Sequence, residues 1–531
     1  MIKLFKFEVL ILLLTISSLK TVSAQIDKGS QLVVNKIIDK TISSEESHSY
    51  SVELQNGMAI IGKVTQKGID LVIDVYSPSG KLIKQIDSPN GTDGDEQFDI
   101  TSNESGIYKF VLHSLDKEVN EGNYLLKVLH ILSLTENTKR ITKKGIPTET
   151  LYNLWEASLT DKTVIDKFIK NHTEKHIIES IEGSNSDMMV TYFCIPQDNT
   201  EYVMLSGGPD FLGLRFQPLP NTKLHFVTQI VPKDARFNYG FNYFNLDKAG
   251  PNNEIESRSM VHAYDGTLEM PNASKQPYIT ERKQVEKGSL LLTSIQSEIL
   301  NEERKITIHT PSNYNASESH NLLIVFDGES YGARPNRRSR IPTPTIMDNL
   351  LEDNKITPTV TVLVWSMGKR SSDLISEKFG DFIVDELIPW VRSQYNIHTE
   401  SNKVVLAGSS RGGFASSFIA FKHSDVIGNV LSQSGSYWIK GSENENHWIY
   451  PEDNGKLINL YKQSERLPIK FYMDIGLYDA GASMLGMNRQ FRDILEIKGY
   501  QVDYREFKGG HNYINWRGTL SDGLISLIGT E

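Results

Sequence analysis

A serine inside a Gly-x-Ser-x-Gly pentapeptide is the residue of this chain best suited to nucleophilic chemistry. The pentapeptide Gly408-Ser409-Ser410-Arg411-Gly412 directly follows the apolar run 403–407 and opens a predicted helix. This strand–turn–helix context strains the turn, and we expect side chains at the two glycine positions to collide with neighbouring backbone. The strain lifts the hydroxyl to the top of a sheet, so Ser410 is the predicted nucleophile. The backbone N–H of Arg411, at the positive end of the helix dipole, is a predicted donor to an oxyanion.

A serine hydroxyl needs a base to take its proton. Two histidines lie well beyond Ser410, namely His447 and His511, and enzymes with this turn place serine, acid and histidine in that order along the chain. His511 follows the last predicted strand and the pair Gly509-Gly510, which suggests a loop free to bring the imidazole over the sheet. His447 lies among polar residues and is interpreted as a surface histidine. His511 is therefore the predicted base.

The acid that orients this base is expected at the end of the preceding strand. Asp479 lies just after the strand-like run 469–474, and Asp474 lies within that run. Asp479 is the better placed candidate and Asp474 is the alternative. Either aspartate can instead be an ordinary helix N-cap or turn residue.

These candidates all lie in a region where predicted strands alternate with predicted helices. The region begins at about residue 301, and an amphipathic helix is predicted over 379–395. Apolar runs predict buried strands at 321–326, 360–365, 403–407, 469–474 and 502–507. Strands separated by helices predict a mostly parallel sheet with helices on both faces, which is the α/β fold class.

Three stretches of different character come before this region. Residues 25–133 show period-two alternation punctuated by turn residues and predict a small β-sandwich. Residues 134–186 are more helical and charged, and residues 187–300 are β-rich again and predict a second sandwich. The first sandwich resembles the bacterial pre-peptidase C-terminal domain, an accessory domain of secreted enzymes, at residues 68–71, 77–80 and 105–108.

The N-terminus has the order of a secretory signal peptide. Lys3 and Lys6 precede the apolar run 9–16, and small residues follow at 22–24, which predicts cleavage after Ala24. The alternative is a membrane anchor, but the run is shorter than the about 20 residues that a span needs. No later segment is long and apolar enough to span a bilayer, so we expect a soluble periplasmic or secreted protein without membrane insertion after cleavage.

Composition excludes several classes of protein. The chain has 531 residues, of which 39% are hydrophobic and 23% charged, as expected for a soluble globular protein. The net charge of −10 argues against general nucleic-acid binding, which needs a basic face. The single cysteine, Cys194, excludes an intrachain disulfide and a thiolate metal cluster. The sequence does not indicate the oligomeric state.

Several motifs, in chain order, make the region from about residue 187 to 531 resemble the enterochelin (enterobactin) esterase family. They lie at residues 220–236, 326–329, 370–374, 408–413, 431–438 and 509–517. The family consists of α/β-hydrolases with an N-terminal β domain, and its members cleave ester bonds of a cyclic tri-catecholate siderophore. The resemblance implies an α/β-hydrolase catalytic domain over 301–531, preceded by a family-type β domain over 187–300.

The resemblance also implies roles for individual residues. Ser410, His511 and Asp479 become the nucleophile, base and acid of a triad. The family often has Glu where Asp479 stands, and because Asp is one methylene shorter, the loop must approach His511 more closely. Arg411 departs from the usual Leu and adds charge beside the site.

A second oxyanion donor is expected on the backbone near Gly328 or Glu329, from their position after the third strand. The implied reaction is acyl transfer to water and needs no metal or organic cofactor, so that any iron arrives as part of the substrate.

Arginines and aromatic residues are candidates for substrate contacts. The loop after the Asp-Gly strand end carries Arg334, Arg337, Arg338 and Arg340, and Arg370 can join them. Guanidinium groups pair with anions and stack on rings, which suits a flat, anionic ferric tri-catecholate. Tyr437 and Trp438 can form an aromatic wall. The alternatives are a solvated, mobile arginine loop and aromatic residues that pack beneath it.

Three functions remain open at this point. The leading hypothesis is an exported serine esterase that hydrolyses a catecholate siderophore and releases its iron. A feruloyl or acetyl carbohydrate esterase would share the whole triad. A non-catalytic binding protein on a hydrolase scaffold is the third, although an abandoned site need not keep Ser410, Asp479 and His511 together.

Overall fold

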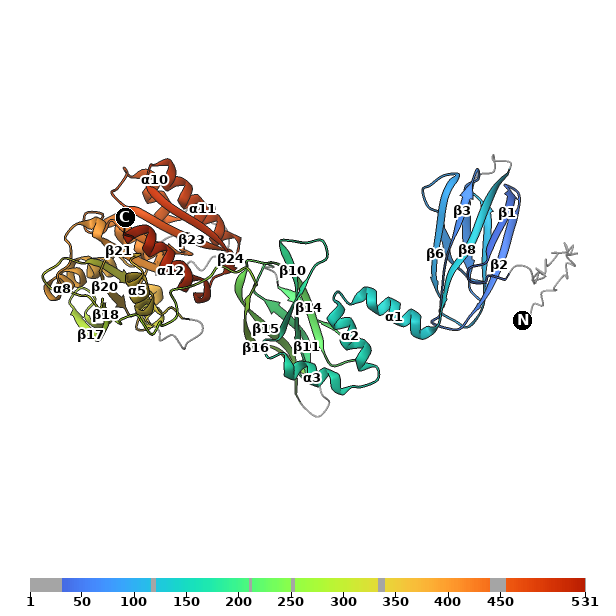
Figure 1. Cartoon of the computed structure of the whole chain (residues 1–531), viewed down its shortest axis with the longest axis horizontal. Helices are drawn as coiled ribbons and strands as arrows, with labels where there is room; N and C mark the ends of the chain where they lie inside the picture. Colours follow the sequence, from blue (N-terminus) through green and yellow to red (C-terminus); the bar gives the residue numbers. More distant parts are fainter. Residues whose placement is uncertain are drawn as a thin grey trace, which may run out of the picture. The chain divides into compact units, whose positions relative to one another are not determined.

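The computed structural model describes residues 31–115, 121–209, 213–249, 254–332, 340–439 and 455–530. The chain divides into two compact units, Met1–Pro147 and Thr148–Glu531. Figure 1 colours the chain along its sequence and labels many of its elements. The predicted signal peptide lies outside the described residues. Across the described ranges, no helix combines the length and the apolar character needed to cross a membrane.

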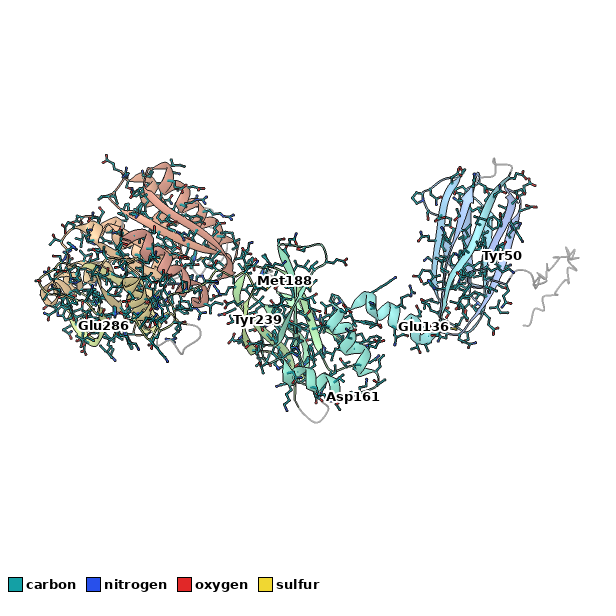
Figure 2. The ribbon with its side chains drawn as sticks, viewed as in Figure 1. Tyr50, Glu136, Asp161, Met188, Tyr239 and Glu286 are labelled. Atoms are coloured by element: carbon teal, nitrogen blue, oxygen red, sulfur yellow. The ribbon has the colours of Figure 1, made fainter. Side chains whose placement is uncertain are left out.

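The first unit is a β-sandwich of two four-stranded sheets, with strand orders β1-β8-β3-β6 and β2-β7-β4-β5. Its strands are β1 (Ile37–Ser43), β2 (Ser47–Leu54), β3 (Ala59–Lys67), β4 (Leu71–Tyr76), β5 (Leu82–Ile86), β6 (Asp93–Thr101), β7 (Gly106–Ser114) and β8 (Glu121–Leu132). Alternate residues of each strand face the core, where the rings of Phe98 and Phe110 lie 5.1 Å apart. The hydroxyls of Tyr50 and Tyr124 share a hydrogen bond of 2.5 Å inside the sandwich. Figure 2 labels Tyr50.

Three helices follow this sandwich. Helix α1 (Leu134–Gly145) begins with a capping box, in which Ser133 and Glu136 satisfy each other's backbone N–H groups. Helices α2 (Glu149–Ser158) and α3 (Thr163–Asn171) belong to the second unit. The segment 134–186, expected to be helical, also contains strand β9 (His176–Ser180), which pairs with β10.

The second unit begins with another sandwich, with strand orders β13-β14-β10-β9 and β12-β11-β15-β16. Its further strands are β10 (Asp187–Cys194), β11 (Thr200–Ser206), β12 (Leu214–Arg215), β13 (Gln217–Pro218), β14 (His225–Pro232), β15 (Arg236–Ala249) and β16 (Glu254–Glu269). Tyr192 and Tyr239 pack edge to face in its core, with ring centroids 4.7 Å apart. Figure 2 labels Tyr239. Burial raises the pKa of Cys194 in the same core to about 12, so this thiol is a packing residue rather than a reactive one.

An eight-stranded sheet forms the rest of the second unit, in the order β17-β18-β20-β19-β21-β22-β23-β24. The strands are β17 (Ser289–Ser297), β18 (Glu302–Thr310), β19 (Asn321–Val325), β20 (Thr359–Val364), β21 (Val404–Ser409), β22 (Asn429–Gln433), β23 (Lys470–Tyr478) and β24 (Gln501–Gly510). β18 is antiparallel to β17 and β20, and the pairs from β20 to β24 are all parallel. The predicted α/β fold is confirmed, and because β17 is its edge strand, this sheet begins before residue 301.

Helices cover both faces of the sheet because its central strands are apolar on both sides. Leu406 of β21 faces the core that holds α9 (Arg411–Lys422), α10 (Lys456–Gln463) and α11 (Ala482–Ile497). Val405 faces the opposite core, with α5 (Thr343–Glu352) and α12 (Tyr513–Ile528). The shorter helices near the site are α4 (Gly328–Tyr331) and α6 (Arg370–Asp373).

The helix expected over 379–395 is a continuous run of three helical pieces. It consists of α7 (Glu377–Asp381), a π-helical turn η1 (Phe382–Leu387) and α8 (Ile388–Gln394). The wide turn comes just before Pro389, whose missing N–H and bulky ring disfavour regular α-helical bonding at that point.

The separate cores of the two units lead to a first prediction. Phe98 is 1% exposed and packs only within the core of the first sandwich. We expect Phe98→Ala to destabilise the first unit by about 3–5 kcal/mol, because it leaves a ring-sized cavity there. Calorimetry should then show one thermal transition shifted to lower temperature and the transition of the second unit unmoved. A parallel shift of both transitions would contradict separate cores.

Candidate active site

The predicted nucleophile lies on a strained turn between β21 and α9. Ser410 has φ 58° and ψ −118°, a conformation that L-residues rarely adopt. A Cβ on Gly408 would lie 2.7 Å from the carbonyl carbon of Gly412, so glycine is required there. The collision expected at Gly412 is not found, because a Cβ there would lie 3.7 Å from the Phe326 Cβ, an ordinary contact. Gly413 is the second tight position, because a Cβ on it would lie only 2.4 Å from Ser432 Oγ.

Hydrogen bonds to the neighbouring strand hold Ser410 in this conformation. Its N–H donates to the Gln433 carbonyl at 2.8 Å, and its carbonyl accepts from the Ser436 N–H at 3.0 Å. The Ser410 hydroxyl lies 3.2 Å from the Ser436 hydroxyl. Between the described residues Ser410 and His511 no hydrogen bond forms in this state. Catalytic hydrogen bonds are often long in substrate-free structures and tighten with substrate, so this geometry is compatible with a Ser-His pair.

His511 and Asp479 are in direct contact. The Nδ1 of His511 lies 2.7 Å from Asp479 Oδ1, and the aspartate side chain is fully buried while the imidazole is 28% exposed. Asp479 Oδ1 also accepts the N–H of Ala480 at 2.6 Å. This contact places the proton of a neutral imidazole on Nδ1 and leaves Nε2 as the acceptor. The His511 ring packs edge to face on Trp516, with centroids 4.8 Å apart, which fixes its orientation.

The two glycines before His511 have a different structural role from the free loop that the sequence suggested. Gly509 and Gly510 are not a free loop but the buried last residues of β24. A Cβ on Gly509 would lie 2.6 Å from the Arg236 carbonyl oxygen of β15 and 2.2 Å from Asn515 Nδ2 of α12. These glycines therefore permit close packing of the strand end, which holds His511 in place instead of letting it move.

The alternative acid, Asp474, lies inside β23 and is fully buried. Neither of its carboxylate oxygens accepts a hydrogen bond of good geometry from a described residue. Burial raises the pKa of Asp474 to about 7, an effect that the nearby Thr519 and Gln433 offset in part. The structure thus brings Asp479, and not Asp474, to His511.

The candidate oxyanion donors lie at two helix starts. The first N–H groups of a helix have no intrahelical acceptor, which leaves the N–H groups of Arg411 in α9 and Gly328 in α4 available. Asp327, with φ 57°, turns the chain into α4, and a Cβ on Gly328 would lie 2.7 Å from the Leu363 carbonyl carbon. The Glu329 carboxylate accepts the Ser366 N–H at 3.0 Å and so fixes this turn to the end of β20.

The candidate substrate arginines are distributed unevenly. Arg334, Arg337 and Arg338 lie outside the described residues. Arg340 donates to the Glu329 carbonyl at 3.1 Å. Arg370 pairs with Asp327 at 2.8 Å and donates to the Ser409 carbonyl at 3.2 Å, so its guanidinium is already committed to the protein.

The two candidate aromatic residues also differ in how accessible they are to a substrate. Tyr437 is fully buried, its hydroxyl bonds Ser417 and Ser432, and its ring packs on Phe491, so it has no face open to a substrate here. Of the two possibilities for Tyr437, an aromatic wall or packing beneath the loop, the structure shows packing. Trp438 is half-buried against the same core and keeps some exposed surface.

Three residues at the site had no role in the sequence-based account. Ser436 contacts the nucleophile, Asp327 neutralises Arg370, and Trp516 orients His511. Each lies inside a motif that the sequence had marked, but spacing alone does not reveal which residue a side chain contacts. Among the described residues, no group of three or more His, Cys, Asp or Glu side chains is arranged to hold a metal ion.

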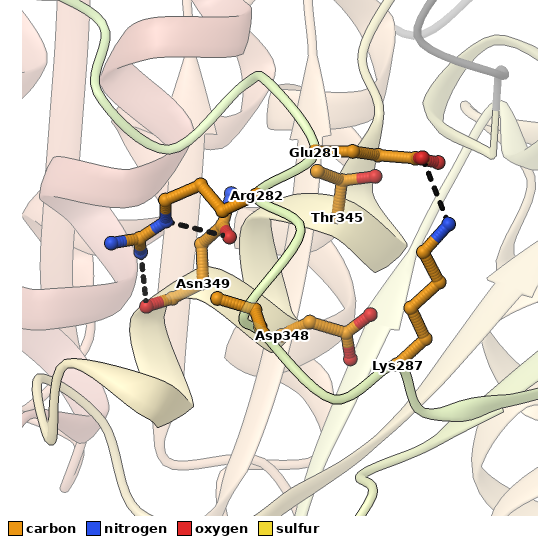
Figure 3. A pocket seen from close by; sticks show the side chains of 7 residues that line it. Glu281, Arg282, Lys287, Thr345, Asp348 and Asn349 are labelled. Atoms are coloured by element: carbon orange, nitrogen blue, oxygen red, sulfur yellow. Dashed lines mark hydrogen bonds and ion pairs between the residues drawn. The ribbon is translucent and has the colours of Figure 1, made fainter.

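A small pocket beside α5 is a poor alternative site (Figure 3). Its volume is about 20 Å³, the space of a single water. Its charged groups already have partners: Lys287 pairs with Glu281 at 2.8 Å, and Arg282 pairs with Asp353 at 3.0 Å. It therefore offers little to a ligand.

Asp474 leads to a prediction on stability. A carboxyl whose pKa rises from 3.8 to about 7 on folding stabilises the native state at low pH and loses that contribution as pH rises through 7. The difference corresponds to about 4 kcal/mol at most. The contribution is lost between pH 3.8 and 7, and about a third of it is already lost at pH 5. We therefore expect Asp474→Asn to raise the melting temperature clearly at pH 8 and by less than half as much at pH 5. The exposed Asp493→Asn is the control, and an equal effect of Asp474→Asn at both pH values would contradict the assignment.

Comparisons with known proteins find similarity to esterases. Residues 297–527 match the family model described as putative esterase. The iron(III) enterobactin esterase of Escherichia coli (strain K12) is 26% identical over 269 residues, 49% of this chain and 62% of that protein. The enzyme of the same description from Dickeya dadantii (strain 3937) is 25% identical over 243 residues, 44% of this chain and 53% of that protein. The chain thus spans between half and two thirds of the length of these relatives.

A solved structure extends the likeness to the preceding sandwich. The enterobactin esterase of Shigella flexneri superimposes with a TM-score of 0.54 at 20% identity, over 68% of this chain and 98% of that one. This likeness concerns the fold, an α/β-hydrolase with a β domain before it. The resemblance of residues 25–133 to pre-peptidase C-terminal domains stays a prediction. For the C-terminal part of the chain, the resemblance to the enterochelin esterase family is confirmed.

Proposed function

We propose that this protein is a serine esterase that hydrolyses the ester bonds of a catecholate siderophore, with Ser410, His511 and Asp479 as its triad. The observation that carries the proposal is the 2.7 Å contact between His511 and the buried Asp479, beside a serine on a strained strand–turn–helix elbow. A buried carboxylate on one imidazole nitrogen fixes the tautomer and stabilises the imidazolium that forms when the other nitrogen takes a proton.

The reaction follows from these positions. The Ser410 hydroxyl turns from Ser436 to Nε2 of His511, which takes its proton as the oxygen attacks the ester carbonyl. The N–H groups of Arg411 and Gly328 stabilise the tetrahedral oxyanion. His511 then protonates the leaving alcohol, and a water activated by His511 hydrolyses the acyl-enzyme.

The substrate class is supported by the relatives. The proteins from E. coli and D. dadantii are described as iron(III) enterobactin esterases, and one Shigella flexneri structure was obtained in the presence of enterobactin. In this chain, the substrate is an ester whose iron, where present, is cargo and takes no part in the chemistry. The signal-like N-terminus supports action outside the cytoplasm, in the periplasm or the medium.

A second candidate function is hydrolysis of feruloyl or acetyl esters of carbohydrates. It is favoured by a 24% identity over 221 residues with the endo-1,4-beta-xylanase/feruloyl esterase of Xylanibacter ruminicola. The same triad serves both reactions, so the substrate must be decided by assay.

The substrate assay uses the chain from Gln25 onward and its Ser410→Ala variant. Each is incubated with ferric enterobactin, iron-free enterobactin, methyl ferulate and nitrophenyl acetate, and products are followed by chromatography. We expect the siderophore to yield linear trimer, dimer and monomer, and the variant to yield none. Turnover of ferulate or acetate alone would move the function to carbohydrate esters, and turnover of none would contradict an esterase.

The acid of the triad is tested by Asp479→Asn against Asp474→Asn. Loss of the Asp479 carboxylate favours the wrong imidazole tautomer, and we expect kcat to fall by about 10³–10⁴. Asp474 does not contact His511, so its variant should keep most of its activity at neutral pH. The reverse ranking would assign the acid to Asp474.

A further inference from the structure

The residue after the nucleophile carries a charge for which the described residues supply no counter-ion. Arg411 is the first residue of α9, and its guanidinium donates to the Ser371 carbonyl at 2.8 Å. Within the described residues, no carboxylate forms an ion pair with Arg411. Its only fixed partner there is therefore a neutral carbonyl, although the side chain is half-buried beside Ser410.

Arg370, the other cation in this part of the site, is neutralised by a carboxylate. Arg370 pairs with Asp327 at 2.8 Å, and the Asp327 side chain is 4% exposed. Burial, and then the positive charge of Arg370, lower the pKa of Arg411 from its usual value, which indicates that the two guanidinium groups are neighbours. Asp327 thus compensates Arg370, and the Glu329 carboxylate is held by Ser366 on the opposite side of the turn.

A half-buried, unpaired cation costs desolvation energy that its hydrogen bond to one carbonyl offsets only in part. Such a cation is stabilised when it forms an ion pair with an anionic group of a bound ligand. Because Arg411 directly follows Ser410 at the start of α9, the ester that Ser410 attacks is the ligand best placed to supply that anion.

We infer that Arg411 is a specificity-determining residue that binds a negatively charged group of the ester substrate, a carboxylate or a catecholate oxygen near the scissile bond. The inference rests on the proposed ester hydrolysis at Ser410 and adds its charge selection. Removal of the charge should lower kcat/KM for an anionic ester by about tenfold relative to a neutral ester of the same size.

The test compares 4-nitrophenyl butyrate with mono-4-nitrophenyl succinate, which differ mainly by a carboxylate at the end of the acyl chain. Arg411→Gln removes the charge but keeps a donor for the Ser371 carbonyl, Arg411→Leu removes both, and Arg411→Lys keeps the charge. Lys422→Gln, in the last turn of α9, removes the same charge away from the site and is the matched control.

We expect the ratio of kcat/KM for succinate to that for butyrate to fall about tenfold in the Gln and Leu variants. The ratio should stay near wild type in the Lys variant and the control, and the wild-type ratio should fall as salt is added. An unchanged ratio in Arg411→Gln would overturn the inference. An equal loss on both esters in Arg411→Leu, restored in Arg411→Gln, would make Arg411 a positioning residue for the Ser371 segment.

A failure of the proposed esterase function would give a different result from a failure of the inference on Arg411. If the wild-type protein hydrolysed neither ester, or if Ser410→Ala hydrolysed both as well as wild type does, the esterase proposal itself would fail. Turnover that depends on Ser410 but shows no charge preference would contradict only the inference on Arg411.

Discussion

The contact between His511 and Asp479 is the interaction on which the rest of the site depends. The two residues directly follow the ends of the neighbouring parallel strands β23 and β24, where Tyr478 is in register with Gly510. Parallel pairing therefore brings an acid and a base together although 32 residues separate them. The contact needs both strand ends to be fixed, and the fold provides this through Gly509, which packs on β15, and Trp516, which packs on the imidazole.

The same strand ends join the hydrolase sheet to the preceding sandwich. Asn515 of α12 donates to the Arg236 carbonyl of β15 at 3.0 Å, and Lys508 of β24 pairs with Asp234 at 2.8 Å. The β domain thus touches the strand and the helix that flank His511. The nucleophile has no part in this junction, because Ser410 is held between β21 and α9 and by a hydrogen bond to Gln433 of β22.

Much of this arrangement can be predicted from the sequence, because the features concerned depend on residues that lie close together in the chain. The glycine-bounded Ser410, the alternation of strands and helices, and the choice of Asp479 over Asp474 as the residue at a strand end all depend on a few neighbouring residues. The carboxylate that contacts His511 belongs to Asp479, the residue that directly follows the end of β23.

The remaining features depend on contacts between distant segments, which no local pattern encodes. Arg370 was a candidate for substrate, but its pairing with Asp327 spans 43 positions of sequence. The sequence left open whether Tyr437 lines the substrate site or packs beneath the loop, and it is buried because Ser417, Ser432 and Phe491 from three other elements enclose it. Gly509 and Gly510 suggested a loop, but both end β24, and the nearby backbone of β15 makes Gly509 a tight packing position.

The central claim is that His511, oriented by Asp479, activates Ser410 as a nucleophile. The most direct measurement is labelling of the full chain with a fluorophosphonate, followed by peptide mapping by mass spectrometry, for the wild type and His511→Ala. The account predicts one adduct, on the peptide that contains Ser410, and a much slower reaction in the variant. A label on another serine, or equal labelling of Ser410 in both proteins, would contradict it.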